Sequence, residues 1–104
     1  MYLIRLYIGA DNETHRVDEA YLDTIRRWAD WVFGSYTLIR GEGHWVDNAR
    51  PVTEDCVVIE VVSTKQISDV YKAVEAFRQD RGQESILVVQ YAVVVWGAEA
   101  TANV

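Results

Sequence analysis

The chain has 104 residues, of which half are hydrophobic and a quarter are charged, and its net charge is −6. This length suits one domain and is too short for two, and the composition is that of a globular chain rather than a disordered one. A nucleic-acid backbone is bound by clustered Lys and Arg, so the negative charge argues against direct nucleic-acid binding.

The first 34 residues predict a strand, a loop and a helix. Residues 2–9 alternate in hydrophobicity, which indicates a strand, and a polar loop follows at 10–16. Residues 17–33 carry apolar side chains at helical spacing, and Gly34 is a suitable C-terminal stop.

The middle of the chain predicts two further strands. Residues 35–47 form the second strand, with a bend or bulge marked by Gly41 and Gly43. A connecting loop is expected at 48–55, where the only proline lies, and the third strand at 56–63.

The last third predicts a helix at 64–82 and a strand that runs to Trp96. The helical stripe consists of Ile67, Val70, Tyr71, Val74 and Phe77. Residues 97–104 are expected to be a flexible tail after a single domain at 1–96.

The order β-α-β-β-α-β predicts an α+β fold, the ferredoxin-like sandwich, with a four-stranded antiparallel sheet and two helices on one face. In this arrangement the first and third strands are central, and the second and fourth are edges. The helices cover only one face of the sheet.

The last strand is apolar on both faces, and such an uncovered edge invites aggregation. We therefore expect a homo-oligomer that associates through this strand and the open sheet face. Counting by twos places Gln90 on the open face, together with Ile86, Val88, Ala92, Val94 and Trp96.

The same counting places Leu3, Arg5 and Tyr7 of the first strand on the open face, and Cys56, Val58 and Glu60 of the third. Arg5 and Glu60 lie mid-strand on neighbouring strands and could form an ion pair. The polar groups among these apolar side chains fit either a ligand pocket or a subunit interface.

The sequence contains no recognisable catalytic, metal or cofactor motif, so no cofactor is expected. Cys56 is the only cysteine, which excludes an intrachain disulfide. If the protein were an enzyme, His44, Tyr7 and Glu60 would be the acid–base candidates. Phosphate groups on a ligand would require basic side chains, for which the candidates are Arg5, Arg40, Arg50, Arg78 and Arg81.

Several short motifs together resemble a family of small uncharacterised proteins of bacteria and their phages. The motifs are an opening strand reading LYIG, Tyr36-Thr37, Gly43-His44-Trp45, Glu54 before the third strand, and Gly82-Gln83-Glu84-Ser85 before the last. The resemblance spans residues 2–96 and implies a ferredoxin-like fold without an established activity. It adds Trp45, Gln83, Glu84 and Ser85 to the ligand-binding candidates, although residues 83–85 could instead only shape the turn.

We expect a non-enzymatic binding protein, phage-encoded if the resemblance holds, that binds a host protein or sequesters a small nucleotide-like defence signal. One alternative is a cofactor-free oxygenase or isomerase of the dimeric ferredoxin-like barrel type. Another is an acidic mimic of nucleic acid, which the scattered carboxylates do not favour. The N-terminus lacks the features of a signal peptide, and no apolar run approaches the roughly 20 residues of a membrane span, so a cytoplasmic location without membrane binding is expected.

Overall fold

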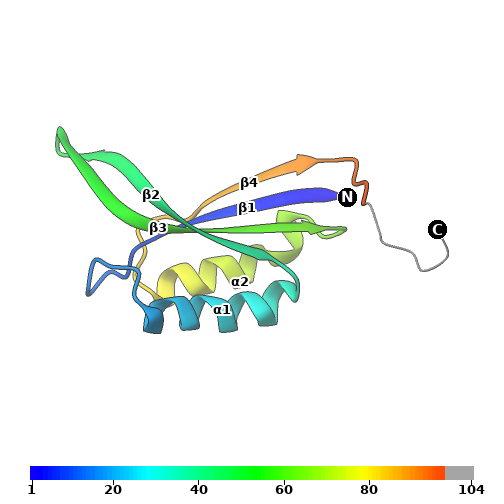
Figure 1. The fold of residues 1–104 in the computed structure, drawn as a ribbon, viewed down its shortest axis with the longest axis horizontal. Coiled ribbons are helices and arrows are strands. Elements are labelled where there is room, and N and C mark those ends of the chain that lie inside the picture. The colour runs from blue at the N-terminus through cyan, green and yellow to red at the C-terminus, as the bar shows by residue number, and fades with distance from the viewer. Residues whose placement is uncertain (98–104) are drawn as a thin grey trace.

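The computed structural model describes residues 1–97, and most of the expected tail at 97–104 lies outside this range. Within it, four strands form one antiparallel sheet and two helices pack against one face, so the predicted ferredoxin-like fold is confirmed (Figure 1). The sheet order is β2-β3-β1-β4, with the first and third strands in the centre as expected. The elements are β1 (Tyr2–Gly9), α1 (Glu19–Phe33), β2 (Thr37–Asp47), β3 (Arg50–Ser63), α2 (Ile67–Asp80) and β4 (Leu87–Ala92).

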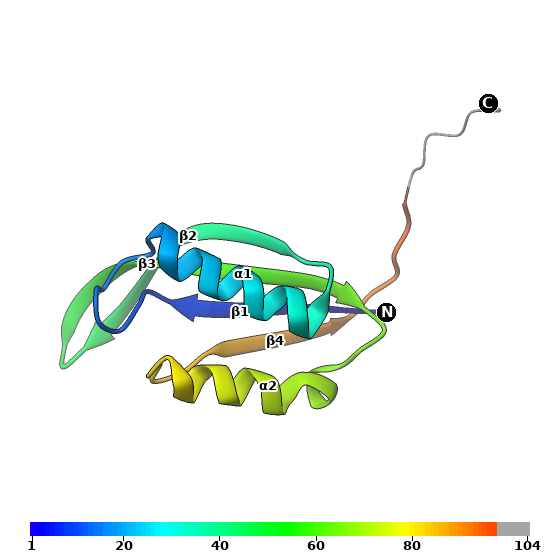
Figure 2. The same cartoon turned by 90° about the horizontal axis from the view of Figure 1, so that it is seen from below.

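The core lies between the sheet and the two helices, which run side by side beneath it (Figure 2). Strict alternation along β1 and β3 produces it, because every second side chain of a strand points to the same face. The buried side chains of the two strands are Ile4, Leu6, Ile8, Val57, Ile59 and Val61, and they pack against Tyr21, Leu22, Ile25, Ala29, Val70, Val74 and Phe77 of the helices. Tyr71, which the helical stripe predicted to be inward, is exposed.

Each helix has a specific N-terminal cap. The Asp18 carboxylate accepts a hydrogen bond from the Tyr21 amide at 2.9 Å at the start of α1, and this helix ends at Gly34 with φ +75°. At the start of α2 the Gln66 amide donates to the Asp69 carboxylate at 2.8 Å. These caps fix the helix ends at the two ends of the sheet.

The β2–β3 connection is much shorter than the loop predicted at 48–55. Asn48 and Ala49 both have positive φ, 47° and 63°, and form a two-residue hairpin turn. Pro51 lies within β3 opposite Val46, on a stretch that pairs only with β2. A proline is tolerated there because its missing N–H faces no strand on the other side. Residues 42–55 thus form an arm that extends beyond β1 (Figure 1).

β4 is shorter than predicted, and its side chains point to the opposite faces of the sheet from those predicted. It ends at Ala92, and the register places Val88 opposite Leu6 and Gln90 opposite Ile4, on the helix side of the sheet. Leu87, Val89 and Tyr91 therefore lie on the open face. Within residues 1–97 no helix is both long and apolar enough to span a membrane.

Candidate functional site

Three segments that are distant in sequence meet where β1 ends: the β1–α1 loop, the β2–β3 arm and the connection from α2 to β4. They enclose a cavity of about 520 Å³, which we call the end pocket. It is lined by Gly9, Ala10, Asn12, His15, Trp45, Glu54, Gln83, Glu84 and Ser85. Its volume lies within the range of small-molecule sites.

The turn at residues 82–85 supplies one wall of the end pocket. Gly82 adopts φ +63°, and the Gln83 amide then donates to the carbonyl of Arg78 at 3.0 Å. The Gln83 side chain is buried and donates through Nε2 to the carbonyl oxygen of Ala10 at 2.8 Å. Glu84 and Ser85 remain exposed beside the cavity. The turn therefore has a structural half, Gly82 and Gln83, and a half that is available to a ligand.

The Arg78 guanidinium stabilises this wall from behind. It donates to the carbonyl oxygens of Gln83 at 3.0 Å and Glu84 at 3.5 Å, and it also binds the Glu75 carboxylate. The hydrogen bonds from Arg78 and then Gln79 lower the pKa of Glu75. Arg78, which the sequence offered as a candidate for binding phosphate groups, is thus engaged by protein groups.

The arm supplies the opposite wall through Trp45 and Glu54. Gly43 pairs with Glu54, and a side chain at position 43 would begin 3.4 Å from the Trp45 ring. The glycine therefore lets the indole lie close over the arm, next to the β3 backbone. The Trp45 ring shares the end pocket with the carboxylates of Glu54 and Glu84, and this combination suits a flat or cationic ligand.

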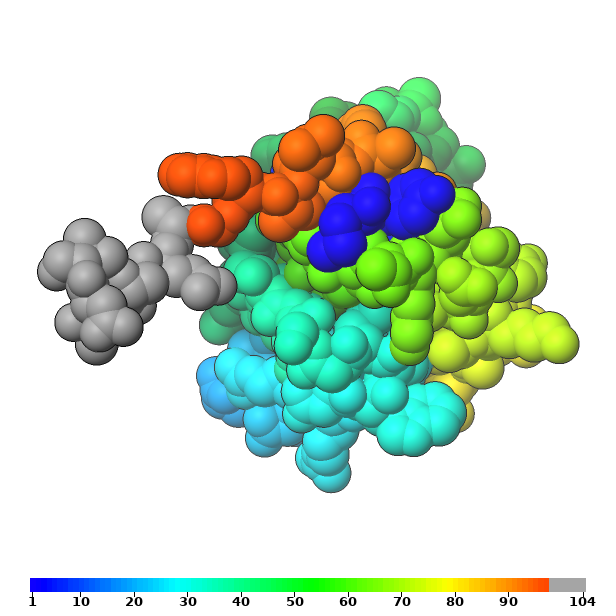
Figure 3. Space-filling model, turned by 90° about the vertical axis from the view of Figure 1, so that its right-hand side faces the viewer, coloured from blue at the N-terminus to red at the C-terminus, as the bar shows by residue number. Residues whose placement is uncertain are grey.

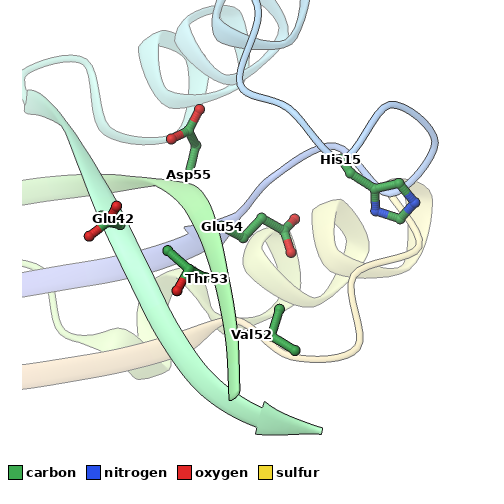
Figure 4. Close-up of a pocket in the computed structure, with 6 residues that line it drawn as sticks. All are labelled: His15, Glu42, Val52, Thr53, Glu54 and Asp55. Atoms are coloured by element: carbon green, nitrogen blue, oxygen red, sulfur yellow. The ribbon is translucent and has the colours of Figure 1, made fainter. Parts of the chain in front are cut away.

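A second hollow adjoins the end pocket and shares His15 and Glu54 with it. This acidic pocket has a volume of about 430 Å³ and is also lined by Glu42, Val52, Thr53 and Asp55. In Figure 4 the Glu54 side chain extends from β3 toward the loop that carries His15, whereas Asp55 points to the other side of the strand. No Arg or Lys occurs among the described residues that line either pocket, and the carboxylates of the lining give it a net negative charge.

A third hollow, the face pocket, lies on the open face of the sheet and shares Gly9 and Trp45 with the end pocket. Its volume is about 480 Å³, and it is lined by Tyr7, Ile8, Gly9, Gly41, Glu42, Gly43, His44, Trp45, Cys56, Val58 and Leu87. Burial raises the pKa of the Cys56 thiol, and the nearby Asp55 adds to this. Cys56 is therefore protonated at neutral pH and is not an activated nucleophile.

The candidate residues fall into separate groups. Trp45, Gln83, Glu84 and Ser85 meet at the end pocket, while Tyr7 and His44 line the face pocket. Arg5 Nε donates to Glu60 at 2.8 Å on the open face, which is the ion pair that the sequence indicated. Glu60 does not line the face pocket, and His44 is held by Glu42 at 2.8 Å and Thr53 at 3.1 Å. The three acid–base candidates thus do not converge on one cavity.

Two candidates lie on the wrong side of the sheet for a ligand on the open face. Arg40 donates to the carbonyl oxygen of Val17 at 2.8 Å, next to the cap of α1. Gln90 accepts a hydrogen bond through Oε1 from the Ile67 amide at 2.7 Å, at the first turn of α2. Its predicted outward orientation is wrong, because this amide of α2 needs an acceptor that the helix cannot supply.

Sequence reasoning missed the contribution of the β1–α1 loop to the site. His15 has φ +59°, and Asn12 lies against Gly82, where an added Cβ would be 3.2 Å from Asn12 Nδ2. Apart from the polarity of the loop, nothing in the sequence indicated that Asn12 and His15 would line a pocket. Among residues 1–97, no three His, Cys, Asp or Glu side chains are grouped so that they could hold a metal ion.

The fold and the pocket define a ferredoxin-like domain with a small-molecule-sized cavity at the end of its sheet. No protein-family model and no curated protein matches the sequence, which is consistent with the resemblance to an uncharacterised family. Solved structures with the same fold include a phage SAM lyase in complex with S-methyl-5′-thioadenosine, at 22% identity and a TM-score of 0.61, covering 86% of this chain and 79% of that one.

Two CutA proteins also share the fold. The PII-like protein CutA from Nostoc sp. PCC 7120 is 14% identical with a TM-score of 0.62, covering 89% of this chain and 81% of that one. CutA1 from Pyrococcus horikoshii OT3 is 7% identical with a TM-score of 0.53, covering 96% of this chain and 88% of that one. At these identities the likeness extends to the fold alone.

Proposed function

We propose that the chain binds a small nucleoside-type molecule, uncharged or cationic, in the end pocket. The observation that carries the proposal is that Trp45 and Glu54 of the arm converge with Glu84 and Ser85 of the α2–β4 connection on one cavity. Of the two ligand classes expected from the sequence, a host protein and a small molecule, a concave pocket of this size favours the small molecule.

The charge of the pocket narrows the ligand class. A phosphorylated nucleotide would meet Glu54 and Glu84 with no described Arg or Lys in the lining, so its phosphates would be repelled. A nucleoside has no such charge, and its base can stack on Trp45 while its hydroxyls donate to the carboxylates. The nucleotide-like signal expected from the sequence is therefore refined to a nucleoside.

The fold likeness to the phage SAM lyase supports a specific probe. That protein is in complex with S-methyl-5′-thioadenosine, a nucleoside without phosphate. S-adenosylmethionine, the substrate that its name gives, adds a sulfonium cation, which an acidic pocket would favour.

Isothermal titration calorimetry with S-methyl-5′-thioadenosine, S-adenosylmethionine and AMP tests the proposal. We expect both sulfur-containing nucleosides, the thioether and the sulfonium, to bind and AMP to bind at least tenfold more weakly. Trp45→Ala should weaken binding by about tenfold to a hundredfold, the effect of losing a base stack of ~1–3 kcal/mol. Trp31→Ala, at an exposed tryptophan of α1, is the matched control and should leave the affinity unchanged. Equal losses in the two variants, or preferential binding of AMP, would contradict the assignment.

A second candidate function is cleavage of S-adenosylmethionine. It is favoured by the two carboxylates in the pocket and by the same fold likeness. Release of S-methyl-5′-thioadenosine breaks the bond between the sulfonium sulfur and the methionine-derived carbon, and the electron pair of that bond stays on sulfur. The carboxylate oxygen of the methionine-derived part attacks the same carbon and closes a lactone, so the reaction balances without another reactant. Chromatography of S-adenosylmethionine incubated with the protein would detect the product, and Glu84→Gln should slow its release if Glu84 acts on the substrate. If the product forms no faster than in the absence of protein, the cleavage function is refuted and only the binding function is retained.

We also propose that the protein acts as a homo-oligomer through β4 and the open face. Exposed apolar side chains gather there, including Leu87, Tyr91 and Val62. Contiguous apolar surface of this kind is typical of interaction sites in soluble proteins.

A further inference from the structure

The segment after β4 is the most exposed apolar part of the described chain. Val94 is 99% exposed and Trp96 is 86% exposed. The Val93 amide donates to the carbonyl oxygen of Met1 at 3.0 Å, and from there the segment leaves the body (Figure 3). Exposing Trp96 and the two valines before it to water is unfavourable by about 1 kcal/mol or more for each, so a partner surface would stabilise them.

The face pocket has the shape and polarity to receive an aromatic side chain. Tyr7, Val58 and Leu87 line it, and Gly41 and Gly43 contribute no side chain. A Cβ at position 41 would lie 3.3 Å from Cys56 Sγ, and one at position 43 would lie 3.4 Å from the Trp45 ring. The two glycines therefore keep open a hollow whose volume of about 480 Å³ exceeds that of one indole.

Residues 93–97 after β4, which we call the tail from here on, cannot reach the face pocket of their own molecule. The pocket includes Leu87 at the start of β4, whereas the tail follows Ala92 at the end of that strand. Five residues of extended strand separate the two by roughly 17 Å, and the chain after β4 continues away from the end of the strand where Leu87 lies (Figure 1). Insertion within one molecule would require the chain to reverse and run back along the sheet.

A second copy meets the conditions for a stable contact. The ionic side chains at the centre of the open face, Arg5 and Glu60, neutralise each other at 2.8 Å, so two copies approach there without like-charge repulsion. The exposed apolar side chains of the face and tail offer roughly 1,000 Å² per copy, against about 800 Å² for a standard interface. They are Tyr7, Ile39, Trp45, Val62, Leu87, Tyr91, Val94, Val95 and Trp96.

From these observations we propose that Trp96 of one copy inserts into the face pocket of a second copy. The inference deepens the proposed self-association and rests on it, but it does not depend on the identity of the ligand. Because Trp45 lines both the face pocket and the end pocket, the inserted Trp96 would support the Trp45 wall of the ligand site. The ligand site would then be complete only in the oligomer. Each copy offers one tail and one pocket, so the contact is reciprocal in a dimer or closes into a ring.

The single natural cysteine permits a direct test, because Cys56 lines the face pocket. Trp96→Cys should give a covalent oligomer on denaturing gels after treatment with a short bismaleimide. The reagent spans the space that the indole occupied and joins the new thiol to Cys56 of another copy. Trp31→Cys, at a helix tryptophan that is 83% exposed, is the matched control and should stay monomeric on the gel. Adding Cys56→Ser to Trp96→Cys should abolish the product. A product that survives Cys56→Ser, or equal products from the two tryptophan positions, overturns the inference.

Size-exclusion chromatography with light scattering covers the case in which Trp96→Cys weakens assembly. Trp96→Ala should raise the dissociation constant of the oligomer at least tenfold. Trp96→Phe and Trp31→Ala should leave the oligomer intact. An unchanged assembly in Trp96→Ala overturns the inference. Calorimetry of the wild-type protein with S-methyl-5′-thioadenosine separates the two proposals. If the wild type binds the nucleoside and Trp96→Cys does not cross-link to Cys56, only the tail contact is refuted. If Trp96→Cys cross-links and the wild type does not bind the nucleoside, only the ligand is refuted.

Discussion

Gln83 Nε2 donates a hydrogen bond to the carbonyl oxygen of Ala10 at 2.8 Å, across 73 positions of sequence. The bond is buried and joins the turn before β4 to the loop after β1. A Cβ at Gly9 would lie 2.9 Å from Gln83 Oε1, so the glycine makes room for the amide. The Tyr21 hydroxyl donates to the Gly9 carbonyl at 2.7 Å. One buried network thus fixes two of the three segments that form the end pocket.

Replacing Gln83 should destabilise the fold. Gln83→Leu keeps much of the volume but leaves the Ala10 carbonyl without its donor, which should lower the free energy of unfolding by about 1–3 kcal/mol. Urea denaturation measures the change. Gln79→Leu, at an exposed position of α2, should lie close to wild type, and a Gln83→Leu protein as stable as that control would show that the network is not needed.

The Tyr21 hydroxyl makes the free energy of unfolding depend on pH in the alkaline range. Burial raises the pKa of Tyr21 to about 12, and the nearby Asp11 adds to the shift. An unfolded tyrosine titrates near 10, so the unfolded state loses its proton first. The stabilising contribution is therefore complete below pH 10 and is lost as the pH rises toward 12. Melting temperatures of wild type and Tyr21→Phe should converge over this window, and a constant difference between them would contradict the assignment.

Strict alternation made the centre of the sheet predictable. In β1 and β3 one face is buried under the helices, so period-two patterning fixes which side chains point inward. The inward orientation of Ile4 and Ile59 was predictable for this reason. The C-terminal end of α1 was predictable from Gly34, which follows its last residue.

The orientation of β4 could not be predicted in the same way. An edge strand that is apolar on both faces has no alternation to count, and Gln90 was mistaken for an open-face residue. Its partner, the Ile67 amide of α2, is 23 positions away and visible only in the fold. The arm was missed because Pro51 argued against a strand, although the β3 edge there is unpaired.

The end pocket was predictable only in part. Trp45, Glu84 and Ser85 were flagged by the family resemblance, and no physical signal in the sequence joined them. Their proximity depends on the arm and on the turn at Gly82, both of which require the positive φ angles of particular residues. His15 and Asn12 come from a loop whose conformation a single sequence does not specify.

The corrected orientation of β4 gives a sharp test of the interface. Leu87 is 62% exposed on the open face, whereas Val88 packs against the core. Leu87→Lys should convert the oligomer to a folded monomer, because an unpaired charge at an apolar interface is unfavourable. Val88→Lys should instead lower the melting temperature sharply by placing that charge in the core. Light scattering and circular dichroism distinguish the two, and a Leu87→Lys protein of unchanged size would exclude the open face as the interface.

Arg78 should affect ligand binding although it does not line the end pocket. Its guanidinium holds the carbonyl oxygens of Gln83 and Glu84, so Arg78→Ala should loosen the wall that carries the Glu84 carboxylate. We expect binding of S-adenosylmethionine to weaken roughly two- to tenfold, the range for one or two lost hydrogen bonds. Arg78→Lys should recover part of this, since an ammonium can still donate to one carbonyl. Arg27→Ala, at an exposed arginine of α1, controls for the loss of a positive charge. If calorimetry shows the same change in both alanine variants, long-range charge and not the clamp on Glu84 is responsible.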